Sequence, residues 1–248
     1  MKILLSGIGG HMGREVAALA LQGYRGAELT AGVDLMGAAG APVSTASDFS
    51  EAETAVDCIV DFSHHSCTHA LLEFAIKNKL PLVLATTGQT EEERKEILAA
   101  GEKIPLFFAA NYSLGIALLI ELAKKTAAAM PEAEIEIIEK HHNRKLDAPS
   151  GTAFAIARAL QEVRTDAELH LGRSGAGKRT QTEIGIHAIR MGNIVGEHEV
   201  LIGTPNQTIT LKHEAHSRAL FAEGALAAAE FLIRQQPGLY DMNSLISA

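Results

Sequence analysis

The feature that most constrains the fold is the alternation of strand and helix patterns along the first half of the chain. Short apolar runs with strand character occupy residues 2–6, 28–33, 56–62, 81–86 and 105–110. Amphipathic segments with helical spacing follow several of them, at residues 15–21, 66–79 and 91–100. Such alternation predicts an α/β domain with a doubly wound parallel sheet, whose ligands bind at the carboxyl ends of the strands.

A glycine-rich turn joins the first strand to the first helix. The turn reads Gly7-Ile8-Gly9-Gly10-His11-Met12-Gly13. Met12 breaks the usual G-x-G-x-x-G spacing, but Gly7, Gly10 and Gly13 can serve the same three roles. These roles are a tight turn, close approach of a pyrophosphate to the backbone, and close helix–strand packing. Strand, glycine turn and helix in this order predict a Rossmann-type dinucleotide site.

The second strand ends in Asp34, where a carboxylate would accept hydrogen bonds from the hydroxyls of an adenosine ribose. Residues 35–38 include no Arg or Lys that could hold a 2′-phosphate. Asp34 therefore predicts that NADH is favoured over NADPH, although His11 and Arg14 could offset the repulsion. The alternative is that Asp34 is only a turn residue at the end of a strand.

Three further strand ends carry residues that we expect to contact the nicotinamide part of the cofactor. The parallel sheet brings all of these ends to one edge. They are Phe62-Ser63, Thr86-Thr87-Gly88 and Asn111-Tyr112.

The stretch at residues 133–160 carries most of the chemistry of the second half. Ile135 and Ile137 alternate with glutamates and predict a strand, and residues 153–160 have helical spacing. Between them lie a cationic loop and a helix start, Lys140-His141-His142-Asn143-Arg144-Lys145 and Asp147-Ala148-Pro149-Ser150-Gly151-Thr152. A helix N-terminus facing cations binds anions, so we interpret this stretch as a carboxylate-binding and proton-donating site. The alternative is a solvated charged face followed by an ordinary turn.

A long helix is expected at 113–130, before this stretch, and another at about 152–163, at its end. The pattern then changes, and a loop without periodicity is expected at 169–180. Residues 183–190, 194–202 and 207–216 look like successive strands with short connections, which predicts antiparallel pairing in a second, α+β domain. The Ala-rich helix expected at 218–234 is predicted to pack back on the first domain.

Composition excludes several classes of protein. The formal net charge of −8 argues against a nucleic-acid partner, and no apolar span long enough for a membrane helix or a leader is present. Cys58 and Cys67 are too few for a disulfide framework, so we expect a cytoplasmic protein. The histidines near these cysteines lack the spacing of a zinc site, and we predict no metal.

Motifs along essentially the whole chain resemble the 4-hydroxy-tetrahydrodipicolinate reductase (dihydrodipicolinate reductase) family. The matching segments are the glycine turn, Asp61-Phe62-Ser63, Ala85-Thr86-Thr87-Gly88, Ala109-Ala110-Asn111-Tyr112-Ser113, Glu139 with His141 to Ala153, Arg190-x-Gly192, Gly196-Glu197-His198 and Ser217-Arg218. Two departures concern the cofactor: His11 stands where Lys or Arg is common, and no Arg follows Asp34.

The resemblance implies an NAD(P)H-dependent enzyme of lysine and diaminopimelate biosynthesis that forms a homotetramer. It implies a dinucleotide-binding domain at residues 1–112 and 218–248 and a mixed-sheet domain for substrate binding and oligomerisation at 113–217. NADH and NADPH are the expected cofactors, and Ala85 and Ala110 join the cofactor contacts.

The substrate implied by the resemblance is a small cyclic dicarboxylate. Ser150, Gly151 and Thr152 would hold one carboxylate, and His142 and Arg218 the other. Lys145 is the favoured proton donor, with His141 orienting the substrate or stabilising charge; the alternative is that both only bind anions.

Two other classes of protein remain open. One is a related two-domain NAD-dependent dehydrogenase of another small carboxylic or amino acid. The other is a non-catalytic dinucleotide sensor, which would not need a cationic site for anions.

Overall fold

The structure is a computed structural model that describes residues 1–247. The chain divides into two compact units. Unit 1 comprises Met1–Leu114 and the segment that begins at Arg218, and unit 2 comprises Gly115–Ser217. Unit 1 is therefore built from both ends of the chain.

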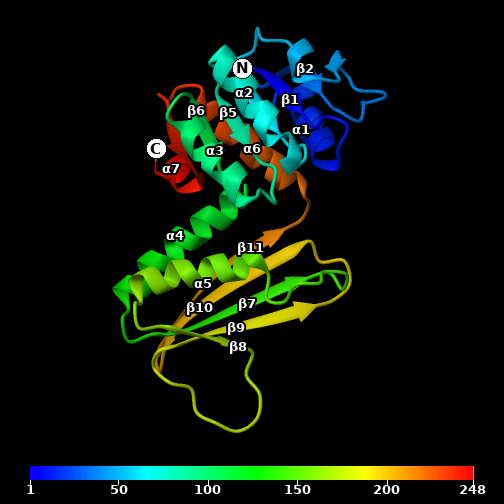
Figure 1. Ribbon diagram of the computed structural model, residues 1–248. Helices are drawn as coiled ribbons and strands as arrows, with labels where there is room; N and C mark the ends of the chain where they lie inside the picture. The colour runs from blue at the N-terminus through cyan, green and yellow to red at the C-terminus, as the bar shows by residue number, and fades with distance from the viewer. Residues whose placement is uncertain (248) are drawn as a thin grey trace. The chain divides into compact units, whose positions relative to one another are not determined.

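Unit 1 contains a parallel sheet. Its strands are β1 (Lys2–Ser6), β2 (Glu28–Val33), β3 (Thr45–Ala46), β4 (Cys58–Asp61), β5 (Leu82–Leu84), β6 (Pro105–Phe108) and β12 (Gly238–Tyr240). Their order is β12-β6-β5-β4-β1-β2-β3, and every pairing is parallel. Figure 1 labels four of these strands, β1, β2, β5 and β6. The apolar runs form buried strands because parallel sheets are covered on both faces.

Helices cover both faces of this sheet. They are α1 (His11–Leu21), α2 (Thr68–Asn78), α3 (Glu91–Gly101), α6 (Ala219–Leu232) and α7 (Met242–Ile246), with short 3₁₀ turns at Tyr24–Gly26, Phe49–Glu51 and His65–Cys67. Residues of α2 and α3 share one apolar core with the sheet. Helix α6 lies against α1 and β4, β5 and β6, which confirms that the Ala-rich helix packs on the nucleotide-binding sheet.

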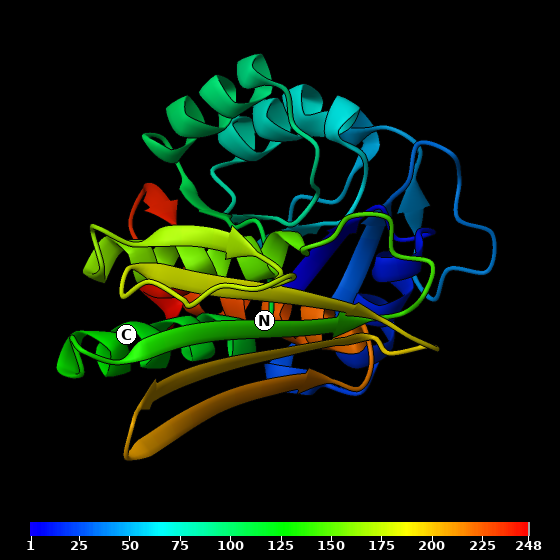
Figure 2. The same ribbon diagram turned by 90° about the horizontal axis from the view of Figure 1, so that it is seen from below.

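Unit 2 is a mixed sheet with two helices on one face. Its elements are α4 (Leu114–Ala129), β7 (Glu134–His141), α5 (Gly151–Val163), β8 (Glu168–Leu171), β9 (Glu183–Arg190), β10 (Gly196–Thr204) and β11 (Gln207–Ala215). The strand order is β11-β10-β7-β9-β8 (Figure 2). Residues of α4 and α5 bury against alternate residues of the central strands, such as Ile135, Ile137 and Val200. No helix within residues 1–247 has the length and apolarity to cross a membrane.

Two sequence-based expectations for unit 2 are only partly correct. Strands β10 and β11 pair in antiparallel fashion, as expected. Strands β9 and β10 do not pair with each other, because β7 lies between them, parallel to β9 and antiparallel to β10. The short connection between β9 and β10 runs past the end of β7, where Met191 N–H donates to the carbonyl of His141 at 2.9 Å. Part of the loop expected at 169–180 is strand β8, which pairs in parallel with β9 and places Leu169 against the core.

Candidate active site

The glycine turn lies between β1 and α1. Gly7 has a φ of +75°, and its N–H donates to the carbonyl of Val33 at 2.8 Å. A Cβ at Gly13 would lie 2.1 Å from the carbonyl oxygen of Gly7, so only glycine lets the helix start this close to the turn. Gly10 precedes α1 and offers no side-chain cap, which leaves the helix N-terminus able to take an anion. The turn therefore fits the pyrophosphate of a dinucleotide.

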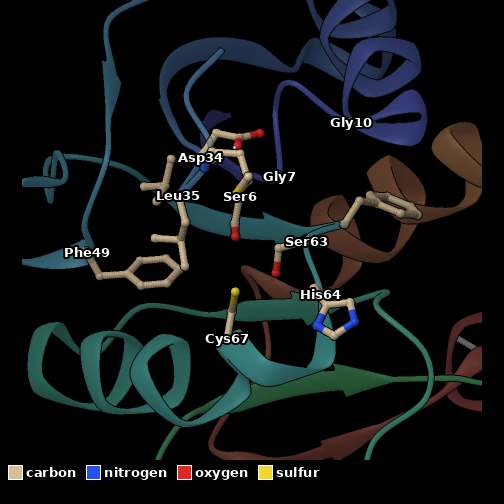
Figure 3. A pocket seen from close by; sticks show the side chains of 12 residues that line it. Ser6, Gly7, Gly10, Asp34, Leu35, Phe49, Ser63, His64 and Cys67 are labelled. Carbon is tan, nitrogen blue, oxygen red and sulfur yellow. Dashed lines mark hydrogen bonds between the residues drawn. The ribbon is translucent and has the colours of Figure 1, made fainter.

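Asp34 borders a pocket of about 190 Å³ at the end of β2. Its Oδ2 accepts a hydrogen bond from Gly9 N–H at 2.8 Å, and its Oδ1 accepts one from Met36 N–H at 3.0 Å. These bonds fix the carboxylate beside the glycine turn and leave lone pairs for ribose hydroxyls. Across the pocket lie Ser63, His64 and Cys67 (Figure 3).

The lining of this pocket is mainly apolar. Its residues are Ser6, Gly7, Gly10, Val33, Asp34, Leu35, Met36, Phe49, Phe62, Ser63, His64 and Cys67. None of these described lining residues is Lys or Arg, so nothing in the lining offsets the charge of Asp34. Arg14 lines a separate hollow between α1 and residues 38–42. The only charged side chain among the described residues that line this pocket is therefore the carboxylate of Asp34.

Asp61 at the end of β4 connects two of the predicted cofactor loops. Its side chain is buried, accepts a hydrogen bond from Thr86 Oγ1 at 2.6 Å and accepts another from Ser63 N–H at 3.2 Å. Burial raises the pKa of the Asp61 carboxyl, against the effect of these hydrogen bonds. A third loop is fixed by Tyr112, whose hydroxyl donates to the carbonyl of Leu84 at 2.9 Å. Sequence reasoning placed these loops correctly at one sheet edge but did not assign Asp61 to hold them.

The histidines near Cys58 and Cys67 form ion pairs with carboxylates. His65 Nδ1 lies 3.1 Å from Glu93 Oε1, and His69 Nδ1 lies 3.0 Å from Glu96 Oε2. Within residues 1–247 no group of three or more His, Cys, Asp or Glu side chains is arranged to hold a metal ion. The contacts of His65 and His69 connect the 3₁₀ turn at residues 65–67 and helix α2 to helix α3.

In unit 2 the centre of the candidate site is Glu139, a residue of β7 whose side chain is completely buried. His141 Nδ1 lies 2.7 Å from Glu139 Oε2, and the Arg190 guanidinium donates to both carboxylate oxygens at 2.7 Å. Burial by itself would raise the pKa of Glu139, but hydrogen bonds from His141, Arg190 and the Ser150 N–H hold it at about 2. Glu139 is therefore ionised at neutral pH.

Ser150 caps helix α5. Its Oγ accepts a hydrogen bond from Ala153 N–H at 3.1 Å, and its own N–H donates to Glu139 Oε1 at 2.9 Å. Gly151, the first residue of α5, is exposed, and a Cβ there would meet no atom within 4 Å. The predicted helix start is thus correct to one residue, and it places Gly151 and Thr152 at the positive end of the helix dipole.

The cationic loop between β7 and α5 carries the other predicted residues of this site. Lys145 is partly buried, and its Nζ lies 2.9 Å from Asp147 Oδ1. His142 directly follows β7 and is also partly buried. Arg218 falls in unit 1, where it is the residue before α6, so it does not belong to the cluster within unit 2.

His198 on β10 is a buried member of this cluster to which sequence reasoning gave no role. Its Nε2 lies 3.1 Å from Ser150 Oγ, and its ring stacks edge-on to that of His141 at 5.3 Å. Burial lowers the pKa of His198 to about 4, and the neighbouring charge of His141 adds to this effect. The strand alternation that places Ile135 and Ile137 inward also places Glu139 and His141 inward, and this signal could have revealed the buried polar cluster.

We expect the free energy of unfolding to fall by about 3 kcal/mol as the pH drops from above 6.5 to about 4, because of His198 alone. Below pH 6.5 His198 is protonated in the unfolded state, whereas in the folded state it stays neutral down to about pH 4. Urea unfolding measures the free energy of unfolding of the wild type and of His198→Gln at pH 7.5 and pH 4.5. The contribution of His198 is the part of the decrease between the two pH values that the wild type shows and the variant does not. Equal pH dependences in the two proteins would contradict it.

The parallel sheet and the glycine turn before α1 define a protein with a Rossmann-type, dinucleotide-binding fold. A probable dehydrogenase from Thermotoga maritima superimposes with a TM-score of 0.64 over 99% of this chain and 92% of that chain. The two sequences are 10% identical, so this likeness concerns the fold alone.

The family follows from sequence comparison. Residues 1–112 match the family described as dihydrodipicolinate reductase, N-terminus, and residues 115–246 match its C-terminus. A 4-hydroxy-tetrahydrodipicolinate reductase from Caldanaerobacter subterraneus subsp. tengcongensis is 45% identical over 99% of this chain and 98% of the relative. The dipicolinate-bound dihydrodipicolinate reductase from Paenisporosarcina sp. TG-14 has a TM-score of 0.80 and 25% identity, with 97% of each chain covered. The chain belongs to the dihydrodipicolinate reductase family, which confirms the predicted family and fold class.

Proposed function

We propose that the protein reduces 4-hydroxy-tetrahydrodipicolinate to tetrahydrodipicolinate with NADH or NADPH, in lysine and diaminopimelate biosynthesis. The observation that carries this proposal is the similarity to named reductases of this substrate over 99% of the chain. The chemistry of unit 2 supports it, because an open helix start beside His and Lys side chains suits a dicarboxylate.

Unit 1 would bind the cofactor, which supplies the hydride when bound. Its glycine turn packs closely against backbone, since a Cβ at Gly7 would lie 2.5 Å from the carbonyl oxygen of Phe62 and one at Gly13 would lie 2.1 Å from that of Gly7. The uncapped N-terminus of α1 beside this turn suits the pyrophosphate. Asp34 would accept hydrogen bonds from the adenosine ribose. The other proposed contacts are Ile8, Gly9, Gly10, His11, Met12, Phe62, Ser63, Ala85, Thr86, Thr87, Gly88, Ala110, Asn111 and Tyr112.

Unit 2 would bind the substrate. Ser150, Gly151 and Thr152 would hold one carboxylate at the N-terminus of α5, where backbone N–H groups and the helix dipole favour an anion. His142 would hold the other carboxylate, and Arg218, to which the resemblance gives the same role, belongs to unit 1.

Reduction requires a proton as well as a hydride. Loss of the 4-hydroxyl group as water gives a ring double bond that is conjugated with the imine. The hydride adds to this double bond and forms a C–H bond, and the displaced π electron pair gives an enamine-like anion. We assign Lys145 as the acid that protonates this anion and becomes a neutral amine. His141 would stabilise the developing negative charge. The alternative is that both residues only bind the dianionic substrate.

We further propose that the protein is a cytoplasmic homotetramer. The family resemblance supports the assembly, and the two buried, unpaired cysteines suit a reducing compartment. Light scattering at neutral pH should give a mass of four 26.3-kDa chains. A monomeric mass at micromolar concentration would contradict the tetramer.

A direct assay tests the reductase function. Purified protein should oxidise NADH only when the dipicolinate intermediate is supplied, and pyridine-2,6-dicarboxylate, a planar analogue of the product, should inhibit. Turnover of another small keto or amino acid instead would indicate the related dehydrogenase. Binding of NADH without turnover of any of these acids would indicate a dinucleotide sensor.

We expect the wild type to have a higher kcat/KM with NADH than with NADPH, and Asp34→Ser to raise the NADPH-to-NADH ratio by about tenfold, which is about 1.4 kcal/mol. The reason is repulsion between the Asp34 carboxylate and the 2′-phosphate, without a Lys or Arg in the pocket lining. Asp48→Ser is the matched control, since Asp48 also accepts a main-chain N–H but does not line the pocket. An unchanged ratio in Asp34→Ser would leave Asp34 as a turn residue only.

A further inference from the structure

The carboxylate of Glu139 accepts four hydrogen bonds inside unit 2. Oε2 accepts from His141 Nδ1 and from Arg190 Nη1, and Oε1 accepts from Arg190 Nη2 and from Ser150 N–H, all within 2.7–2.9 Å. An ionised carboxylate has about four lone-pair sites, so this one is fully used by protein donors. Glu139 has no remaining capacity to bind a substrate, and its action must pass through its neighbours.

We propose that Glu139 is a positioning residue for the reduction, which holds the imidazole of His141 in one orientation with a proton on Nδ1 and directs Nε2 to the substrate. This inference rests on the proposed reductase function. It adds Glu139 to the residues already assigned to the site, as a group that acts through His141.

The protonation of His141 follows from the charge of its partner. Because Glu139 is ionised and can only accept, Nδ1 must carry the hydrogen in the 2.7 Å contact. Nε2 is then the ring atom that can exchange or share a proton with a ligand. Across the strand pair, a Cβ at position 196 would lie 3.1 Å from Nε2, and Gly196 avoids this close contact. A similar carboxylate–imidazole contact fixes the tautomer in other enzymes.

Arg190 extends the same arrangement to the cationic loop. Its Nη2 also donates to the carbonyl of Asp147 at 2.6 Å, and Asp147 pairs with Lys145. The Glu139–Arg190 pair therefore connects β7 and β9 to the loop that carries Lys145. Through this pair, Glu139 orients both candidate groups for proton transfer or charge stabilisation.

The ionisable groups around Glu139 come from several elements. They are His141 on β7, Arg190 on β9, His198 on β10, His213 on β11, and Lys145 and Asp147 in the loop. Burial holds the pKa of His198 at about 4, so His198 is neutral at pH 7. The negative charge of Glu139 is thus balanced by the guanidinium of Arg190, and the carboxylate also accepts the hydrogen bond from His141 Nδ1.

The variant Glu139→Gln tests the inference in the full-length enzyme. We expect kcat to fall by about 10- to 100-fold, part of the 10²–10⁴-fold that general acid catalysis contributes, with KM changed only a few-fold. The pH profile of kcat should also change, because a neutral amide no longer supplies the charged acceptor that holds the proton on Nδ1. Glu136→Gln is the matched control: Glu136 lies on the opposite face of β7 and contacts His187 Nε2 at 2.8 Å. It should leave kcat and its pH profile unchanged.

A second measurement does not depend on activity. ¹⁵N NMR of histidine-labelled wild type should place the proton of neutral His141 on Nδ1, and Glu139→Gln should lose this preference. The double variant Glu139→Gln with Arg190→Met also removes the partly buried cation that has lost its carboxylate partner, and it should unfold at a higher urea concentration than Glu139→Gln without regaining kcat.

These readouts separate the inference from the function on which it rests. An Nε2–H tautomer in the wild type, or unchanged kcat, pH profile and NMR signals in Glu139→Gln, would overturn the inference. A wild type that lacks reductase activity but has the Nδ1–H tautomer would instead overturn the proposed function.

Discussion

Replacing Lys145 with alanine is expected to lower kcat by about 10²- to 10⁴-fold, the usual contribution of a positioned general acid. Lys145 is partly buried and paired with Asp147 at 2.9 Å, so its ammonium is held in place beside the start of α5. After hydride addition, the substrate anion would depend on water for its proton. Steady-state kinetics of the variant with saturating NADH, together with calorimetric binding of pyridine-2,6-dicarboxylate, measures the two roles of the residue separately.

The controls distinguish proton donation from anion binding. Lys140→Ala removes another cation of the segment at residues 140–145. Lys140 is paired with Glu197 at 3.0 Å on the opposite face of β7, so kcat should stay near the wild-type value. His141→Ala should lower kcat less than Lys145→Ala if His141 stabilises charge. If Lys145→Ala raises only KM and weakens dicarboxylate binding, Lys145 is a substrate-binding residue and not the acid.

Replacing Gly13 with alanine is expected to weaken NADH binding by about 100-fold, which is about 2.8 kcal/mol and the scale of one lost hydrogen bond to a charged group. The new Cβ would lie 2.1 Å from the carbonyl oxygen of Gly7, so either the helix or the turn must move. Either movement changes the backbone N–H groups that we assign to the pyrophosphate. Fluorescence titration with NADH measures the loss, and circular dichroism verifies that the variant is folded.

Gly177→Ala is the matched control for this prediction. A Cβ at Gly177 would meet no atom within 4 Å, and the residue lies in the loop after β8, so NADH binding should stay unchanged. Folded Gly13→Ala protein with wild-type affinity for NADH would show that the turn tolerates a side chain. That result would remove Gly7, Gly10 and Gly13 from the proposed cofactor site.

The parts of the fold that depend on local pattern could be predicted from the sequence. Strand–helix alternation predicted the parallel sheet of unit 1, and the Ser150 signal placed the start of α5 within one residue. Asp34 was predicted at the end of the second strand for the same reason: the end of an apolar run is visible in the sequence itself.

The parts that depend on long-range register could not be predicted. Arg190 reaches Glu139 because β9 pairs in parallel with β7, and this pairing joins residues about fifty positions apart. Short connections suggested instead that β9 pairs with β10, and nothing in the local sequence places β7 between them. Strand alternation could point to Glu139 and His141, but their partners Arg190 and His198 became visible only once the strand order was known.

The composition of unit 1 from both ends of the chain has a consequence for biosynthesis on the ribosome. Helix α6 and strand β12 are synthesised after unit 2, yet α6 lies against α1 and β12 forms one edge of the parallel sheet. Until α6 is available, the nascent chain exposes the apolar surface that α6 covers, whereas unit 2 is one continuous segment, residues 115–217. Unit 2 can therefore fold before unit 1 is complete, and unit 1 can be completed only after unit 2 has been synthesised.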